Sequence, residues 1–123
     1  MTLNATLVET LEVSNQLGEG VIWDHRTGRL WWTDILACQL HCWTFAGEHQ
    51  CFNTPERLCS FGLTSDCDTL IGAFESGFAL YRPWQQSMNW IAKVDEHDPD
   101  TRLNDGRIDR QGRFWAGSMR EHG

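Results

Sequence analysis

The feature that most constrains the fold is a pattern that occurs three times along the chain at nearly constant spacing. Each copy is a short strand, a polar turn that begins with Asp, and a second strand rich in aromatic or aliphatic residues. The copies are GEGVIWDHRTGRLWWTDI at 18–35, CSFGLTSDCDTLIGAFE at 59–75 and NDGRIDRQGRFWAGSM at 104–119. The turn aspartates, Asp24, Asp66 and Asp109, follow one another after 42 and 43 residues. An acidic residue that begins a turn and Gly or Asp that ends it predict a β-hairpin, because Asp accepts turn hydrogen bonds and the last position tolerates positive φ.

Two further strands are expected between successive hairpins. They are QLHCWTF at 39–45, CFNTP at 51–55, FALYRP at 78–83 and WIAKV at 90–94. Four antiparallel strands in each period indicate a blade of a β-propeller, and an antiparallel sandwich with evenly spaced hairpins is the alternative. The propeller is favoured because the period holds twice with matching turn chemistry. Helices should be few, with a short one around 84–90, since helical periodicity is otherwise lacking.

The chain is long enough for fewer than three such blades. We expect one partial β-propeller domain over 1–123, with blade units at about 15–57, 58–100 and an incomplete 101–123. Propellers close with about four to eight blades, and each blade buries its faces against two neighbours. An open stack of this size leaves blade faces and strand edges exposed, which favours self-association through those faces.

Charge and composition exclude several classes of partner. The net charge of −7 argues against nucleic acid and against an anionic membrane, both of which need a basic face. No apolar stretch approaches the roughly 18 residues of a membrane span, and no basic leader precedes an apolar run, so no signal peptide is expected. The five cysteines form an odd set without a C-x-x-C pair, which is typical of reduced thiols. These features predict a cytoplasmic protein.

Two motifs in combination carry a family resemblance. LGEGVIWD with LWWTDI in 17–35, and RLNDGRIDRQGRFWAGSM at 102–119, closely resemble the regucalcin–gluconolactonase family, also called the senescence-marker-protein family. The resemblance runs from about residue 10 to residue 119. It implies an all-β fold, the six-bladed lactonase-type propeller, in a protein roughly twice this length or more. Such proteins bind one divalent cation in the central channel and hydrolyse lactones of sugars or related compounds.

The same resemblance assigns roles to residues at the starts of the first and third copies. It implies that Glu19 is the metal-binding carboxylate of the first blade, and that Arg102 and Asn104 line the substrate pocket. Arg offers forked donors, and Asn both donates and accepts, which suits sugar hydroxyls and carbonyls. Calcium, zinc, magnesium and manganese all accept hard oxygen ligands, so the residues leave the native metal open; calcium or zinc is favoured, with magnesium or manganese as alternatives.

Other candidates are assigned less directly. Asp105 either joins the substrate-binding pair or braces its turn by accepting backbone N–H bonds, and the bracing role is favoured. Glu121 corresponds loosely to an acidic residue that holds substrate in relatives, with a shift of one residue that makes His122 the alternative. The acidic loop DEHDPD at 95–100 is expected to be a solvated loop. Four histidines are expected at the surface: His25, His41, His49 and His97.

The family chemistry requires more than this chain supplies. In relatives, the cation polarises the lactone carbonyl, and a carboxylate takes the proton from the attacking water. The remaining metal ligands, an Asn and an Asp that is also the general base, are expected beyond residue 123. The favoured hypothesis is therefore a portion of a metal-dependent lactonase that is weak or inactive alone. The alternatives are a short self-assembling homologue and a non-catalytic calcium-binding or protein-interaction module.

Overall fold

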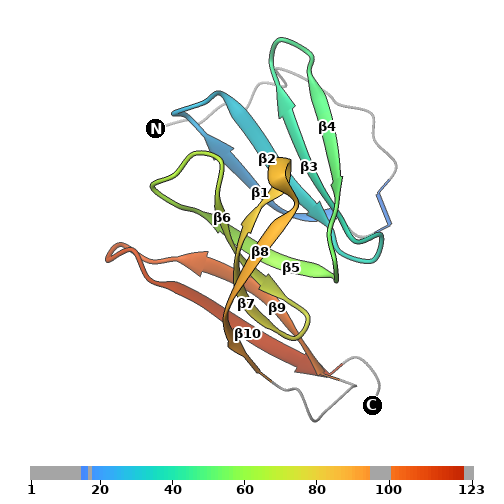
Figure 1. Ribbon diagram of the computed structural model, residues 1–123, viewed down its shortest axis with the longest axis vertical. Coiled ribbons are helices and arrows are strands. Elements are labelled where there is room, and N and C mark those ends of the chain that lie inside the picture. The colour runs from blue at the N-terminus through green and yellow to red at the C-terminus, as the bar shows by residue number, and fades with distance from the viewer. Residues whose placement is uncertain (1–14, 17, 95–100, 121–123) are drawn as a thin grey trace, which may run out of the picture.

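In this computed structural model, residues 15–16, 18–94 and 101–120 are described, and they form three antiparallel sheets that follow one another in chain order (Figure 1). The first sheet, here called the first blade, contains β1 (Gly18–Asp24), β2 (Arg29–Asp34), β3 (Gln39–Thr44) and β4 (His49–Asn53). The second blade contains β5 (Leu58–Leu63), β6 (Leu70–Phe74), β7 (Gly77–Arg82) and β8 (Ser87–Lys93). The partial third blade pairs β9 (Thr101–Ile108) with β10 (Phe114–Arg120).

Each of the two complete sheets is a meander in which every strand pairs with its chain neighbours. The strand orders are β1-β2-β3-β4 and β5-β6-β7-β8. The predicted all-β fold class is therefore confirmed. The strands of the three sheets lie within 15–57, 58–100 and 101–123, respectively.

The prediction of a short helix around 84–90 is mostly wrong. A 3₁₀ helix covers only Pro83–Gln85, and β8 begins at Ser87. Gln86 ends the helix because it adopts the left-handed conformation, with φ of 51° and ψ of 40°, while its N–H donates to the carbonyl of Pro83. The residues after this turn continue as a strand because they pair with β7.

An apolar core fills the space between the first and second blades. Trp31 and Leu40 of the first blade belong to one buried cluster with Phe61, Phe74 and Tyr81 of the second. Alternation along each strand explains this, because every second side chain points to the same face of its sheet. Burying several aromatic side chains is the main favourable contribution to holding the two blades together.

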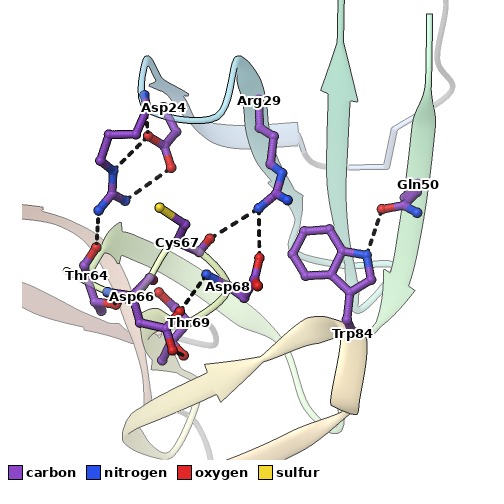
Figure 2. A network of polar contacts seen from close by, with 10 residues as sticks. Asp24, Arg29, Gln50, Thr64, Asp66, Cys67, Asp68, Thr69 and Trp84 are labelled. Atoms are coloured by element: carbon purple, nitrogen blue, oxygen red, sulfur yellow. Dashed lines mark hydrogen bonds and ion pairs between the residues drawn. The ribbon is translucent and has the colours of Figure 1, made fainter.

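Polar contacts join the same two blades at the rim that carries the hairpin turns (Figure 2). Arg29 Nη1 donates to the carbonyl of Cys67 at 3.3 Å and to Asp68 Oδ1 at 3.0 Å. The Arg29 guanidinium also lies 4.5 Å from the ring centroid of Trp84. Arg26 Nη1 donates to the carbonyl of Thr64 at 2.7 Å. These contacts place the first hairpin turn directly beside the second.

The three turn aspartates act in the same way, as the sequence predicts. Each carboxylate accepts the backbone N–H two residues further on, at 2.9–3.0 Å; the donors are Arg26, Asp68 and Gln111. The pKa of all three carboxyls is lowered, chiefly by the Arg26 side chain at Asp24 and by backbone N–H groups at Asp66 and Asp109. The pKa of Asp109 falls to about 2. The predicted role of the aspartates is therefore confirmed at all three hairpins. Positive φ at the last turn position is observed at Gly28 and Gly112 but not at Asp68.

One predicted surface residue is buried instead. His41 on β3 is only 7% exposed, and its ring stacks on Trp32 with centroids 4.9 Å apart. Its Nδ1 shares a hydrogen bond of 2.9 Å with His49 Nε2. His25 and His49 are exposed as predicted, and His97 lies outside the described residues. No helix in the described part of the chain has the length and apolar character needed to cross a membrane.

Candidate functional site

The first strand of each blade contributes to one cavity of about 810 Å³. β1, β5 and β9 each supply four consecutive residues to its lining, so the three strands share this cavity although they are far apart in the sequence. The polar residues in the lining are Glu19, Ser60, Asp105 and Arg107. A cavity with a few polar groups among apolar side chains is the usual form of a small-molecule site.

A shift of register interrupts the pairing of each of these three strands. In β9, Leu103 lies opposite Ser118 and Gly106 opposite Ala116, so Asn104 and Asp105 together face the single residue between those partners. Similar shifts follow Glu19 in β1 and Leu58 in β5. An extra residue in a strand changes the direction of the side chains around it. The irregularities therefore determine how the candidate residues point.

Glu19 is exposed and lines the cavity near the start of β1. The next residue, Gly20, has a φ of +67°, which a residue with a Cβ rarely adopts, and packs against the ring of Phe61. Glycine thus allows β1 to turn at this point while it contacts the second blade. Asp105 lines the same cavity from the third blade.

The donor set for a divalent cation is incomplete. Glu19 offers a carboxylate oxygen, which suits a hard cation. Within 15–16, 18–94 and 101–120, however, no group of three or more His, Cys, Asp or Glu side chains is arranged to hold a metal ion. Glu19 thus offers a single carboxylate, and the described residues do not supply a set of three such ligands by themselves.

Arg102 and Asn104 lie together, close to the cavity but outside its lining. Arg102 Nη1 donates to Asn104 Oδ1 at 3.2 Å and to the carbonyl of Leu103 at 3.0 Å. Arg102 is 6% exposed, and Asn104 is partly buried. Burial raises the pKa of the neighbouring Cys59 thiol to about 11, although the Arg102 charge acts in the opposite direction. Because Arg102 is buried and its Nη1 donates to Asn104 Oδ1, the guanidinium is well placed to orient the amide of Asn104.

Asp105 and the C-terminal candidates complete the list of predicted residues. Asp105 Oδ1 accepts the N–H of Gly106 at 2.9 Å, which is the kind of backbone contact expected of a bracing residue. Its side chain is exposed and also lines the cavity. Glu121, His122 and the acidic loop at 95–100 lie outside the described residues.

Sequence reasoning missed Ser60. This residue of β5 is 1% exposed, lines the cavity, and donates from Oγ to the carbonyl of Asn104 at 2.7 Å. One signal was available, because the repeat makes Ser60 equivalent to Gly18 and Leu103, the residues directly before Glu19 and Asn104. Ser60 is a hydroxyl residue at that position in an otherwise apolar strand, so it could have been considered as a hydrogen-bond donor to the third blade.

Comparison with known proteins identifies similar sequences in one family, and two of the most similar relatives are named as lactonases. The family described as "SMP-30/Gluconolactonase/LRE-like region" matches residues 17–123. The L-arabinolactonase of Azospirillum brasilense is 37% identical over 113 residues, which are 91% of this chain and 37% of that protein. The 6-deoxy-6-sulfogluconolactonase of Pseudomonas putida is 35% identical over 118 residues, which are 95% of this chain and 40% of that protein.

A solved structure shows the same architecture. Regucalcin of Agrobacterium tumefaciens, described as a calcium-binding protein, has a TM-score of 0.81 and 28% identity, over 88% of this chain and 37% of that one. The likeness confirms the predicted fold class, a β-propeller of the six-bladed lactonase type of which this chain supplies fewer than three blades. The chain spans about 37–40% of the length of these relatives.

Proposed function

Because the chain belongs to the SMP-30/gluconolactonase/LRE-like family, we propose that it forms part of a metal-dependent hydrolase of sugar or related lactones. The relatives named as lactonases support the reaction class. The observation that carries the proposal to particular residues is the cavity between β1, β5 and β9, because Glu19 lies in its lining and the Arg102–Asn104 pair lies beside it.

Each residue has a role that follows from its chemistry. Glu19 would be one oxygen ligand of a divalent cation, with calcium or zinc favoured and magnesium or manganese as alternatives. A cation bound there would polarise the lactone carbonyl and stabilise negative charge on its oxygen. The Arg102 guanidinium and the Asn104 amide would bind substrate hydroxyl groups, and the bond from Arg102 Nη1 to Asn104 Oδ1 would keep that amide in one orientation. Glu121 remains a proposed substrate ligand.

The present chain supplies only part of this site, and we expect it to be weak or inactive alone. A hard divalent cation such as calcium takes about six or more oxygen ligands, and a single carboxylate replaces few of the water molecules that already surround it, so binding to Glu19 alone should be weak. A non-catalytic calcium-binding module is the second candidate, and the likeness to a regucalcin described as calcium-binding favours it. A cytoplasmic location remains a prediction from the sequence.

A two-part experiment tests the proposal. The purified 123-residue chain should hydrolyse a sugar lactone no faster than the spontaneous rate, with or without added calcium or zinc. A chimera in which this chain replaces the matching segment of the Azospirillum brasilense L-arabinolactonase should hydrolyse L-arabinonolactone, and a chelator should abolish the activity.

Variants of the chimera assign the activity to Glu19. Glu19→Gln removes the negative charge from the proposed ligand and should lower kcat/KM by at least about a hundredfold, the scale on which loss of an electrostatic contact to the transition state acts. Glu48→Gln is the matched control, because Glu48 is an exposed carboxylate that lies outside the lining of the cavity. A folded chimera without activity would overturn the lactonase proposal.

A further inference from the structure

We propose that Ser60 is a positioning residue of the candidate site. By this proposal, the hydroxyl of Ser60 holds the irregular part of β9, and so sets where the Asn104 amide and the Arg102 guanidinium lie. The proposal rests on the proposed function for its catalytic meaning, but its structural content can be tested independently of catalysis.

A hydrogen bond from Ser60 satisfies the backbone of β9 where its pairing is interrupted. Two residues of β9, Asn104 and Asp105, face one residue of β10, so the ladder between these strands is interrupted where the candidate residue lies. Backbone groups at such an interruption need partners from elsewhere. The carbonyl of Asn104 finds one in the second blade, since Ser60 Oγ donates to it at 2.7 Å. The neighbouring N–H of Leu103 donates to the carbonyl of Glu75 at 3.4 Å, also in the second blade.

The second and third blades approach each other closely at this point. A Cβ built on Gly106 would lie 2.8 Å from Ser60 Oγ and 2.6 Å from the carbonyl oxygen of Trp115. These separations are too short for a real carbon atom, so glycine is required there. Its absence of a side chain lets β9 come near enough to β5 for the Ser60 hydroxyl to reach the backbone of Asn104.

The backbone of this segment also determines where the side chains of Arg102 and Asn104 lie. Arg102 Nη1 binds two acceptors that belong to the same short segment, the carbonyl of Leu103 and Oδ1 of Asn104. Both acceptors move if the peptide groups of this segment rotate. Ser60 fixes the carbonyl of Asn104, and with it the peptide plane next to that of Leu103. Loss of the hydroxyl should therefore change the geometry of the amide as well as the stability of the chain.

A matched pair of variants separates positioning from simple stabilisation. Thr33 Oγ1 donates to the carbonyl of Leu58 at 2.7 Å, which is also a buried hydroxyl–carbonyl bond between adjacent blades. Ser60→Ala and Thr33→Val each remove one such bond, and Thr33→Val also removes a longer bond of 3.4 Å to the carbonyl of Gln39 within the first blade. If Ser60 only satisfies a buried carbonyl, the two variants should have similar consequences. If Ser60 positions the site, only Ser60→Ala should alter Asn104.

The deciding measurement is NMR spectroscopy of the isotope-labelled 123-residue chain. We expect Ser60→Ala to shift or broaden the side-chain amide signals of Asn104 and the guanidinium signals of Arg102. Thr33→Val should leave both sets of signals unchanged, and Ser60→Thr, which retains a hydroxyl, should restore the wild-type positions. Unchanged Asn104 signals in folded Ser60→Ala, checked by the dispersion of its other resonances, would overturn the proposal.

A kinetic measurement on the chimera described above tests the catalytic meaning. There, Ser60→Ala should lower kcat/KM by about tenfold, as expected when one hydrogen bond to the substrate is misaligned, and Ser60→Thr should recover most of it. Equal losses in Ser60→Ala and Thr33→Val would contradict a positioning role. An inactive chimera would refute the proposed function alone, because the NMR result on the isolated chain would still decide whether Ser60 positions Asn104.

Discussion

At the scale of single residues, the burial of His41 illustrates how a polar side chain is accommodated in the first blade. Its ring stacks on both Trp32 and His49, with centroids 4.9 and 5.1 Å away, and it lies at an interplanar angle of 2° to the indole. The stacking explains why a polar ring is tolerated at 7% exposure. Its Nε2 is buried and has no hydrogen-bond partner within the described residues, so a second proton on the ring would have no acceptor.

A pH dependence of stability follows from this environment. The pKa of His41 is lowered, first by burial and then by the nearby His49, with Asp34 acting in the opposite direction. The folded chain therefore binds this proton less readily than the unfolded chain. Above the ordinary histidine pKa of about 6.5, His41 is neutral in both states and does not affect stability. As the pH falls from about 6.5 toward the lowered pKa of folded His41, the free energy of unfolding should decrease. Urea unfolding midpoints across this range measure the effect.

The control for this prediction is a second histidine. His41→Phe should flatten the pH dependence between neutral and mildly acidic conditions, because it removes the titrating group and keeps an aromatic ring. His25→Asn changes an exposed turn residue and should leave the dependence as in the wild type. An equal flattening in both variants would show that the effect does not come from His41.

At the scale of strands, the recurring feature is the break in register of the first strand of each blade. The breaks follow Glu19 in β1, Leu58 in β5 and Leu103 in β9. Each strand is therefore regular where it enters its hairpin turn, and its register shift lies in the half away from that turn. Bulges beside functional sites commonly redirect a side chain, and this arrangement places the candidate residues on the irregular halves of the strands.

Within the second blade, Gly77 of β7 lies very close to the backbone of the paired strand β8, and this contact can be tested by substitution. A Cβ on Gly77 would overlap the carbonyl oxygen of Ala92 and lie 2.8 Å from Cα of Lys93. Because both obstacles are backbone atoms of the paired strand, Gly77→Ala should lower the free energy of unfolding by about 1–3 kcal/mol. Gly117→Ala is the control, since its Cβ meets no atom within 4 Å and should change stability by less than about 0.5 kcal/mol. Chemical denaturation of both variants decides, and equal effects would contradict the steric argument.

At the scale of the whole molecule, large apolar side chains remain exposed on both outer sheets. Phe45 is 61% exposed beside the first blade and contacts Trp23 and Trp43, with ring centroids 5.7 and 4.7 Å away. Trp115 on β10 is 61% exposed. Exposed apolar surface of this kind favours contact with another apolar surface in water.

We therefore expect the 123-residue chain to self-associate through its exposed blade faces. Light scattering should show an average mass that rises with protein concentration. Phe45→Ser should reduce that rise because it removes an exposed ring from the first blade. Glu48→Ser is a matched control, since Glu48 is an exposed polar residue of the same turn between β3 and β4, and its replacement removes no apolar surface. A constant monomer mass at all concentrations would refute the expectation.

The sequence by itself determined the repeat, the hairpins and the all-β class. This was possible because the information is local: an aspartate at the start of each turn and alternating apolar residues lie within a few residues of one another. The same local turn chemistry appears in the structure at Asp24, Asp66 and Asp109. The proximity of Arg102 and Asn104 could also be anticipated, since they are two residues apart.

Only the tertiary structure decided the features that depend on which blades meet. Local alternation contains no sign of the extra residue at Asn104 and Asp105, because a bulge is a property of two paired strands. The burial of His41 depends on Trp32 and His49 from neighbouring strands, and the bond from Ser60 to Asn104 joins residues 44 positions apart. Such contacts form only when whole sheets pack against each other, because packing determines both which side chains are buried and which hydrogen bonds can form. The conformational preferences of short segments do not specify them.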